Sequence, residues 1–206
     1  MYYDYHMHCD FSRDSKTPME DMIRKSIDLK LSEICFTDHS DYSILVNNIE
    51  QDHEVDYKNY LKSLEFFQNK YKKEITIKKG VEIGLQNHTI DKCIEDIKSY
   101  DFDFVIASIH TINKSDLIDR DFYKNKSQYE AYRQYYENLY NIIKKFKNYS
   151  VLGHLDLVKR YGDLNNIIDD KIFGDEIDEI LKMAIYDGKG IEINTSCFRY
   201  NMPDLT

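Results

Sequence analysis

The sequence predicts an α/β fold in which helices connect the strands of a mostly parallel sheet. Short runs rich in β-branched and aromatic residues alternate along the 206 residues with longer segments of helical periodicity. No stretch rich in proline or glycine interrupts the alternation, so we expect one domain over residues 1–206. Strands joined in this way form a sheet that is either doubly wound or closed into a barrel.

Six segments have the composition and length of strands. In chain order they cover residues 2–6, 33–37, 75–83, 102–108, 150–154 and 190–194. In both candidate architectures, functional groups gather at the carboxyl ends of the strands. The residues that follow these segments are therefore the first place to look for a site.

The helices between the strands carry recognisable start signals and apolar faces. Residues 17–20 (TPME) combine a capping-box pattern with proline, which we expect at the first helical position. Residues 127–130 (SQYE) form a second capping box, followed by an apolar face that extends to residue 146. An apolar stripe over residues 177–185 predicts a further helix packed on the core, and segments 54–71 and 89–99 are also expected to be helical.

Composition limits the classes of partner. Lysine and arginine number 28 against 37 aspartate and glutamate residues, a net charge of −9, so we expect no nucleic-acid partner. No apolar run approaches the roughly 18 residues of a membrane span, and the first residues lack a signal-peptide pattern. We therefore expect a cytoplasmic protein with no membrane partner, and its four cysteines, which form no C-x-x-C pair, to be reduced thiols.

Imidazole and carboxylate groups gather where the predicted strands end. His6 and His8 are two residues apart and therefore share one face of the first strand. The next four strands also end in such groups, namely His39, Glu82, His110 and His154. Nitrogen and oxygen ligands without thiolate suit Zn²⁺, Mn²⁺ or Fe²⁺. One ion needs only three or four of these groups, so the surplus indicates a multinuclear site with Glu82 as a natural bridge.

The motif order resembles a known superfamily. H-x-H, an aspartate, T-D-H, G-x-E-x-G, S-x-H and G-H-x-D follow one another as in the polymerase and histidinol phosphatase (PHP) superfamily, and in detail as in its histidinol-phosphate phosphatase branch, from residue 2 to about residue 203. The resemblance implies a distorted (β/α)7 barrel and a trinuclear metal centre. It implies His6, His8 and Glu82 as ligands of the first metal, Glu82, His110 and His154 of the second, and Asp14 and His39 of the third.

Two arginines are candidates for binding phosphate. Arg160 and Arg199 follow the fifth and sixth predicted strands, and the resemblance implies that they grip the phosphate. A guanidinium group matches the oxygens of a phosphate in an otherwise acidic protein. Ser196 is a weaker candidate for the same pocket, and we expect Glu82, His39 and Arg160 to act in catalysis.

Four polar residues near these motifs have open or minor roles. Asp38 and Asp156 lie beside predicted ligand histidines and either orient imidazoles or cap the following helices. His53 and His88 match no predicted strand end, so we expect surface or loop positions for both.

The function that the resemblance implies is metal-dependent hydrolysis of a phosphate monoester. The expected substrate is L-histidinol phosphate, which yields L-histidinol and phosphate in histidine biosynthesis. Two alternatives stay open: a PHP phosphoesterase for a nucleotide, sugar phosphate or phosphotyrosine, and a non-catalytic, metal-stabilised module that binds a phosphorylated ligand. A small-molecule phosphomonoester is thus the expected partner, and a homo-oligomer is compatible with the sequence.

The chain departs from the family pattern at its end. The family pattern continues into a further strand with an aspartate and a histidine in a G-S-D-A-H-like stretch, whereas this sequence stops at Thr206 without it. These two groups would complete the first and third metal sites. Three explanations stay open: the sequence is a truncated form of a longer enzyme, a partner supplies the missing edge, or the centre is reduced to the second metal with weakened neighbours. Of these we expect truncation, with a barrel that lacks its last strand and leaves a sheet edge open.

Overall fold

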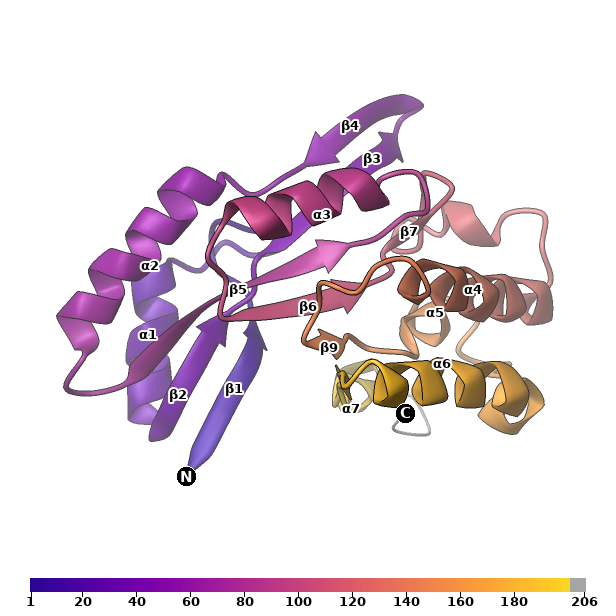
Figure 1. Cartoon of the computed structure of the whole chain (residues 1–206). Helices are drawn as coiled ribbons and strands as arrows, with labels where there is room; N and C mark the ends of the chain where they lie inside the picture. Colours follow the sequence, from indigo (N-terminus) through magenta and orange to yellow (C-terminus); the bar gives the residue numbers. More distant parts are fainter. Residues whose placement is uncertain (201–206) are drawn as a thin grey trace.

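The computed structural model describes residues 1–200 and contains a curled sheet that is parallel along its main path (Figure 1). The strand order on this path is β1-β2-β5-β6-β9-β10, and each neighbouring pair is parallel. The strands span Tyr2–Met7 (β1), Leu31–Phe36 (β2), Thr76–Gly84 (β5), Phe104–Ser108 (β6), Val151–Leu152 (β9) and Gly190–Ile191 (β10). Within residues 1–200, β1 and β10 do not pair with each other, so the sheet is open.

All six predicted strands occur, but the last two are shorter than expected. In particular, residues 192–194 do not continue β10. The α/β class and the parallel sheet are therefore confirmed.

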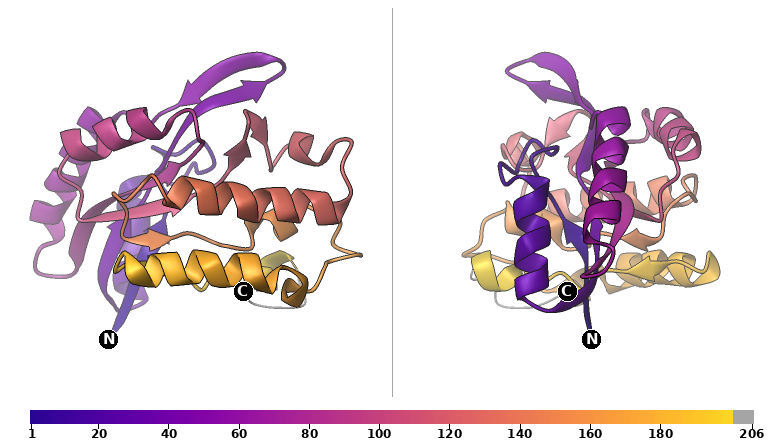
Figure 2. Two further views of the ribbon diagram at one scale, coloured as in Figure 1. Left: turned by 45° about the vertical axis from the view of Figure 1, so that its right-hand side comes forward. Right: turned by 90° about the vertical axis from the view of Figure 1, so that its left-hand side faces the viewer.

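Two hairpins were not predicted from the sequence. Strand β3 (His39–Val46) is parallel to β5 and antiparallel to β4 (Ile49–His53), and this hairpin projects beyond the rest of the sheet (Figures 1 and 2). A smaller hairpin joins β7 (Thr111–Ile112) to β8 (Ser115–Asp116). Both two-residue turns have positive φ throughout, 52° and 62° at residues 47 and 48, and 49° and 68° at residues 113 and 114. This conformation matches the twist of the flanking strands, and asparagine adopts it more readily than most residues.

The helices follow the strands as the alternation predicted. They are α1 (Met19–Asp28), α2 (Tyr57–Tyr71), α3 (Ile90–Ser99), α4 (Gln128–Ile143), α5 (Leu157–Arg160), α6 (Gly174–Tyr186) and α7 (Cys197–Tyr200), with 3₁₀ turns η1 (Asp121–Tyr123) and η2 (Asp170–Phe173). Helices α4 and α6 pack side by side (Figures 1 and 2). None of the helices within residues 1–200 combines the length and the apolar character needed to span a membrane.

The two predicted capping boxes have different outcomes. At α4 the prediction is confirmed, because the Ser127 side chain accepts from the Glu130 N–H while the Glu130 side chain accepts from the Ser127 N–H. At α1 it is wrong: Pro18 is the N-cap rather than the first helical residue, and no side chain caps this end. The proline ring fixes φ at −55°, but ψ is extended at 141°, so helical geometry begins only at Met19.

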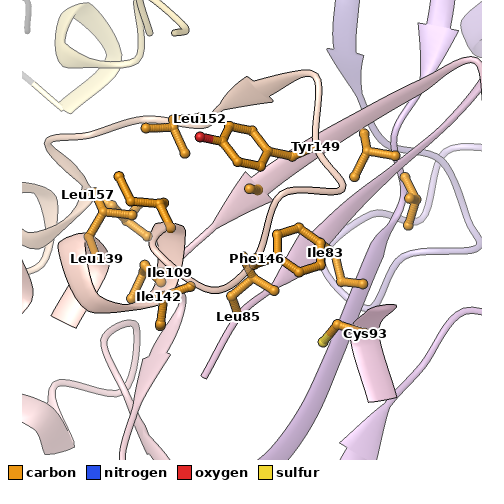
Figure 3. Packing of buried hydrophobic residues seen from close by; sticks show 14 of the residues in the cluster. Ile83, Leu85, Cys93, Ile109, Leu139, Ile142, Phe146, Tyr149, Leu152 and Leu157 are labelled. Carbon is orange, nitrogen blue, oxygen red and sulfur yellow. The ribbon is translucent and has the colours of Figure 1, made fainter. Parts of the chain in front are cut away.

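The core lies between the sheet and its helices and fixes the direction of the β5 side chains. Phe146 lies beside Ile83 and Leu85, and Leu139 and Ile142 of α4 lie near Ile109 in the same cluster (Figure 3). Each such side chain contributes roughly 1.5–3 kcal/mol when fully buried. Since successive strand residues face opposite ways, burying Ile83 on the core side directs residue 82 to the other face of the sheet.

Candidate metal centre

Glu82 lies at the centre of the site and is fully buried. Its Oε2 atom lies 3.0 Å from His6 Nε2, 3.1 Å from His8 Nε2 and 3.4 Å from His39 Nδ1. His39 is the first residue of β3 and the direct register partner of Glu82 on β5. The first strand thus delivers two imidazoles to one carboxylate oxygen, and the neighbouring strand delivers a third.

The second oxygen of Glu82 faces the other side of the site. Its Oε1 atom lies 3.1 Å from His110 Nε2 and 2.9 Å from His154 Nε2, and it accepts a hydrogen bond of 2.6 Å from Ser108 Oγ. His110 follows β6 and His154 follows β9. One buried carboxylate is therefore shared by five imidazoles, two from the end of β1 and one each from the start of β3 and the residues after β6 and β9.

Two aspartates also contact nitrogens of these rings. Asp14 Oδ2 lies 3.2 Å from His8 Nδ1 and 3.6 Å from His39 Nε2. Asp41, which the sequence reasoning missed, places Oδ1 2.8 Å from His110 Nδ1 and Oδ2 3.5 Å from His39 Nδ1. Its position two residues after His39 was the available signal, but that signal had meaning only once residues 39–46 were known to form a strand.

Glu192 was also missed and connects β1 to β9. Its Oε1 atom lies 2.7 Å from His6 Nδ1, and its Oε2 atom accepts from the His154 N–H at 2.7 Å and from Asn194 Nδ2 at 3.1 Å. The sequence G-I-E-I-N at residues 190–194 places two polar residues on one face after the sixth strand, which is the signal that could have found it.

Two glycines allow the close approach of these groups. A Cβ atom at Gly84 would lie 1.7 Å from Asp41 Oδ1 and 3.1 Å from His110 Nδ1, so a side chain there would separate this pair. A Cβ atom at Gly153 would lie 2.4 Å from Ser108 Oγ, the donor to Glu82. The glycines in the G-x-E-x-G and G-H motifs therefore have a steric role at the site.

The protonation equilibria reflect the dense packing of opposite charges. Burial alone would raise the pKa of Glu82, but the charges of His6, His39 and His110 hold it well below the ordinary value. Burial would lower the pKa of His6, whereas Glu82 and Glu192 raise it to about 10. For His154 burial prevails and the pKa is lowered. The lowered pKa of Glu82 favours its ionised form, which is the form that can act as a metal ligand.

The donor set fits divalent metal ions. Three groups of side chains each place their donor atoms within 4.8 Å of one another: His6, Glu82 and His154; His8, His39 and Glu82; His39, Asp41 and His110. Among residues 1–200, the buried atoms His8 Nε2 and His39 Nδ1 have no hydrogen-bond partner, although both lie near carboxylate oxygens. Unpaired imidazole nitrogens beside carboxylates are the ligands expected for Zn²⁺, Mn²⁺ or Fe²⁺. His6 and His8 fall in different groups, and the division of ligands among three ions stays a prediction.

The predicted phosphate-binding residues line the same cavity of about 1320 Å³ as the histidine cluster. Arg160 ends α5, and its Nη2 donates to Ser196 Oγ at 2.7 Å and to Asn194 Oδ1 at 3.4 Å. Arg199 lies on α7 and lines the cavity as well. The structure thus places Arg160, Ser196 and Arg199 in the same cavity as the histidine cluster.

The remaining polar candidates have other contacts. Asp38 accepts from the N–H of Cys9 at 2.8 Å and from its thiol at 3.2 Å, so it contacts the end of β1 rather than an imidazole or a helix end. Asp156 is the N-cap of α5 but makes no side-chain capping bond. His88 is exposed, as expected, whereas His53 is half-buried at the end of β4, so it lies on a strand rather than in a loop, and it lines the cavity.

Comparisons with known proteins agree with this geometry. The profile of the PHP domain matches residues 4–196. The histidinol-phosphatase of Lactococcus lactis subsp. lactis is 34% identical over 197 residues, which cover 95% of this chain and 72% of that protein. A probable histidinol-phosphatase of Clostridium acetobutylicum is 31% identical over 201 residues, which cover 95% of this chain and 73% of that protein.

Solved structures lead to the same family. The crystal structure of histidinol phosphate phosphatase from Lactococcus lactis, complexed with Zn, L-histidinol and phosphate, superimposes with a TM-score of 0.90 at 34% identity and covers 96% of this chain and 74% of that chain. The crystal structure of a putative histidinol phosphatase from Listeria monocytogenes superimposes with a TM-score of 0.77 at 18% identity. The match covers 98% of this chain and 86% of that chain, and it supports the fold. With its histidine cluster arranged around Glu82 and this extent of similarity, the chain belongs to the PHP domain family.

Proposed function

We propose that this protein is a metal-dependent phosphate-monoester hydrolase that converts L-histidinol phosphate and water into L-histidinol and phosphate. The observation that carries the proposal is the fully buried Glu82 carboxylate, shared by five imidazoles within one cavity that Arg160 also lines. The similarity to the Lactococcus lactis histidinol-phosphatase supports the choice of substrate.

We propose three divalent ions, Mn²⁺, Zn²⁺ or Fe²⁺, in the complete site. The residues that would hold them are His6, His8, Asp14, His39, Glu82, His110 and His154, with Asp41 among the neighbouring donors. When bound, such ions neutralise charge on the phosphoryl group and activate water as a nucleophile. Glu82 joins the groups, since its two oxygens face different sets of imidazoles.

Arg160, Ser196 and Arg199 would bind the phosphate. A guanidinium group donates two parallel hydrogen bonds to phosphate oxygens and stabilises the charge that develops on them during transfer. Ser196 and Asn194 contact Arg160 Nη2, and Asn194 donates to Glu192, which contacts His6 and His154, so the arginine is connected to the histidine cluster through Asn194 and Glu192. His39 lies between Asp14 and Asp41, where its imidazole would help to position the phosphoryl group of the substrate.

The finer architecture that we propose is the distorted (β/α)7 barrel implied by the sequence resemblance. Within residues 1–200, β1 and β10 are the two ends of the main strand order and do not pair with each other. Glu192, which follows β10, already contacts His6 of β1, so the two ends approach each other at the site.

The test is phosphate release from L-histidinol phosphate by the purified protein with added Mn²⁺. A chelator-treated sample and the His110→Ala variant are the controls, and both should lose turnover because each removes part of the metal site. A panel of a nucleotide, a sugar phosphate and phosphotyrosine separates the substrate alternatives. Faster turnover of another monoester would contradict the proposed substrate, and binding of L-histidinol phosphate without turnover would contradict the proposed hydrolysis.

A further inference from the structure

One buried amide side chain, that of Gln86, lies between two hairpins that adjoin the histidine cluster. Strand β5 ends at Gly84, whereas the neighbouring β3 continues over residues 42–46. Gln86, two residues after the end of β5, is 3% exposed, and its Nε2 donates to the carbonyls of Tyr42 at 2.7 Å and of Ser43 at 3.1 Å. The Gln86 side chain therefore supplies a donor to β3 where the backbone of β5 no longer pairs with it.

The oxygen of the same amide contacts the other hairpin. Gln86 Oε1 accepts from the N–H of Lys114 at 2.8 Å, and Lys114 is the second residue of the turn between β7 and β8. The Lys114 carbonyl accepts from the Leu45 N–H of β3 at 3.0 Å, and its ammonium group lies 2.6 Å from Glu50 Oε2 of β4. Gln86 and Lys114 thus connect the β3–β4 hairpin to the β7–β8 hairpin.

Ser43 bends β3 at the point that Gln86 contacts. Its φ is 58°, in the left-handed region that residues other than glycine rarely adopt, and the pairing of β3 with β4 shifts register between residues 41 and 44. The Ser43 N–H donates to Asp52 Oδ1 at 2.8 Å, and its hydroxyl lies 2.8 Å from His88 Nε2. Because Gln86 satisfies the carbonyl, every polar group of Ser43 has a partner, and these contacts hold the bend in place.

Both connected segments adjoin a pair of potential metal ligands. The bend at Ser43 lies two residues after Asp41, and the β7–β8 hairpin begins directly after His110. Asp41 Oδ1 lies 2.8 Å from His110 Nδ1, and both residues belong to one group of donors that could hold an ion. The length of this contact therefore depends on how the two hairpins lie relative to each other.

Resting on the proposed function, we infer that Gln86 is a positioning residue that sets the Asp41–His110 pair and thereby the affinity for the ion that this pair would help to hold. Gln86 does not line the cavity, so it would touch neither metal nor substrate. An apolar side chain in its place leaves two carbonyls of β3 and the N–H of Lys114 buried without a partner. The hairpins would then separate to admit water, and the Asp41–His110 contact would lengthen.

The test measures metal binding in a double-mutant cycle. Gln86→Met removes the amide at similar length and should weaken the binding of one Mn²⁺ equivalent by about 10-fold, which corresponds to one unsatisfied buried hydrogen-bonding group. In the Asp41→Asn background the same substitution should change the affinity by less than about twofold, because the pair that Gln86 positions is already weakened. The matched control is Gln68→Met: Gln68 Nε2 also donates to a strand carbonyl, that of Ile77 at 2.8 Å, but neither residue lines the cavity, so Mn²⁺ binding should equal that of the wild type.

Hydrogen exchange of the metal-free proteins tests the connection between the hairpins directly. The amides of Lys114 and Leu45 should exchange at least about 10-fold faster in Gln86→Met than in the wild type, because one loses its acceptor and the other joins the two hairpins. Gln86→Glu retains an oxygen for the Lys114 N–H and should keep this amide slower than Gln86→Met does.

Two results would overturn the inference. An equal loss of Mn²⁺ affinity in both backgrounds would assign Gln86 a general structural role, and a wild-type affinity in Gln86→Met would show that the amide does not act on the metal site. If Gln86→Met does not fold, the wild type still decides: Mn²⁺ should slow exchange at Lys114, because coupling between the site and the hairpins is reciprocal, and unchanged exchange would refute the coupling. A wild type that binds Mn²⁺ but releases no phosphate from L-histidinol phosphate would contradict the proposed function alone, whereas a wild type that binds no divalent ion would refute both.

Discussion

Glutamine at position 192 should weaken metal binding without removing a predicted metal ligand. Glu192 accepts from two groups at once, with Oε1 2.7 Å from His6 Nδ1 and Oε2 2.7 Å from the His154 backbone nitrogen. Glutamine has one acceptor oxygen and one NH₂ donor, so it can accept from only one of these two groups. At the other, the NH₂ group of glutamine would face an N–H donor, and the hydrogen bond would be lost. The variant therefore loses one charge-assisted contact and weakens the orientation of His6 or of His154.

The size of the effect follows from these contacts. Burial would raise the pKa of Glu192, yet His6 lowers it to about 2, which indicates a strong interaction between the two groups. One hydrogen bond to a charged group contributes about 1.5–3 kcal/mol. Changes to the outer partners of metal-binding histidines typically weaken metal affinity or activity by about 10- to 100-fold, which agrees with that energy. We expect Glu192→Gln to fall within this range.

The assay is a metal titration with turnover measured on the same samples. Purified wild type and Glu192→Gln are equilibrated against buffered Mn²⁺ or Zn²⁺, and bound metal is quantified by mass spectrometry. Glu65→Gln makes the same chemical change on the exposed face of α2, at a residue that does not line the cavity, and should behave as wild type. Metal affinity and turnover in Glu192→Gln that equal those of the wild type would refute the idea that this carboxylate orients His6.

Three further substitutions test other parts of the structure. Glu82→Gln should lower metal content and turnover together by more than about 100-fold, because it removes the charge shared by the imidazoles; an unchanged metal load, measured by mass spectrometry, would exclude a bridging role. Arg160→Ala should reduce kcat/KM for the phosphomonoester by about 10- to 100-fold while metal content stays constant, and steady-state kinetics that match the wild type would remove it from the phosphate site. Ser127→Ala removes the observed cap of α4 and should cost about 1 kcal/mol, or roughly 2–4 °C in Tm; calorimetry that detects no shift would show that the capping box with Glu130 contributes little.

Local sequence patterns were sufficient for the class of fold and for most of the histidine cluster. The alternation of strand and helix predicted a parallel sheet, and parallel strands bring their carboxyl ends to one edge. His6, His110 and His154 could therefore be placed near Glu82 from their positions along the chain alone. The capping box at Ser127 was equally local, because its two partners are three residues apart.

Tertiary structure decided the contacts that depend on register between distant segments. His6 and Glu192 are 186 residues apart, and no local preference for strand or helix specifies their 2.7 Å contact. Asp41 entered the site only because residues 39–46 form a strand whose register with β5 aligns His39 with Glu82. Sequence periodicity reports on neighbours within a few residues, whereas register and hairpin placement are set by packing across the whole sheet, which is why the sequence determined the class of site and the tertiary structure determined its complete set of contacts.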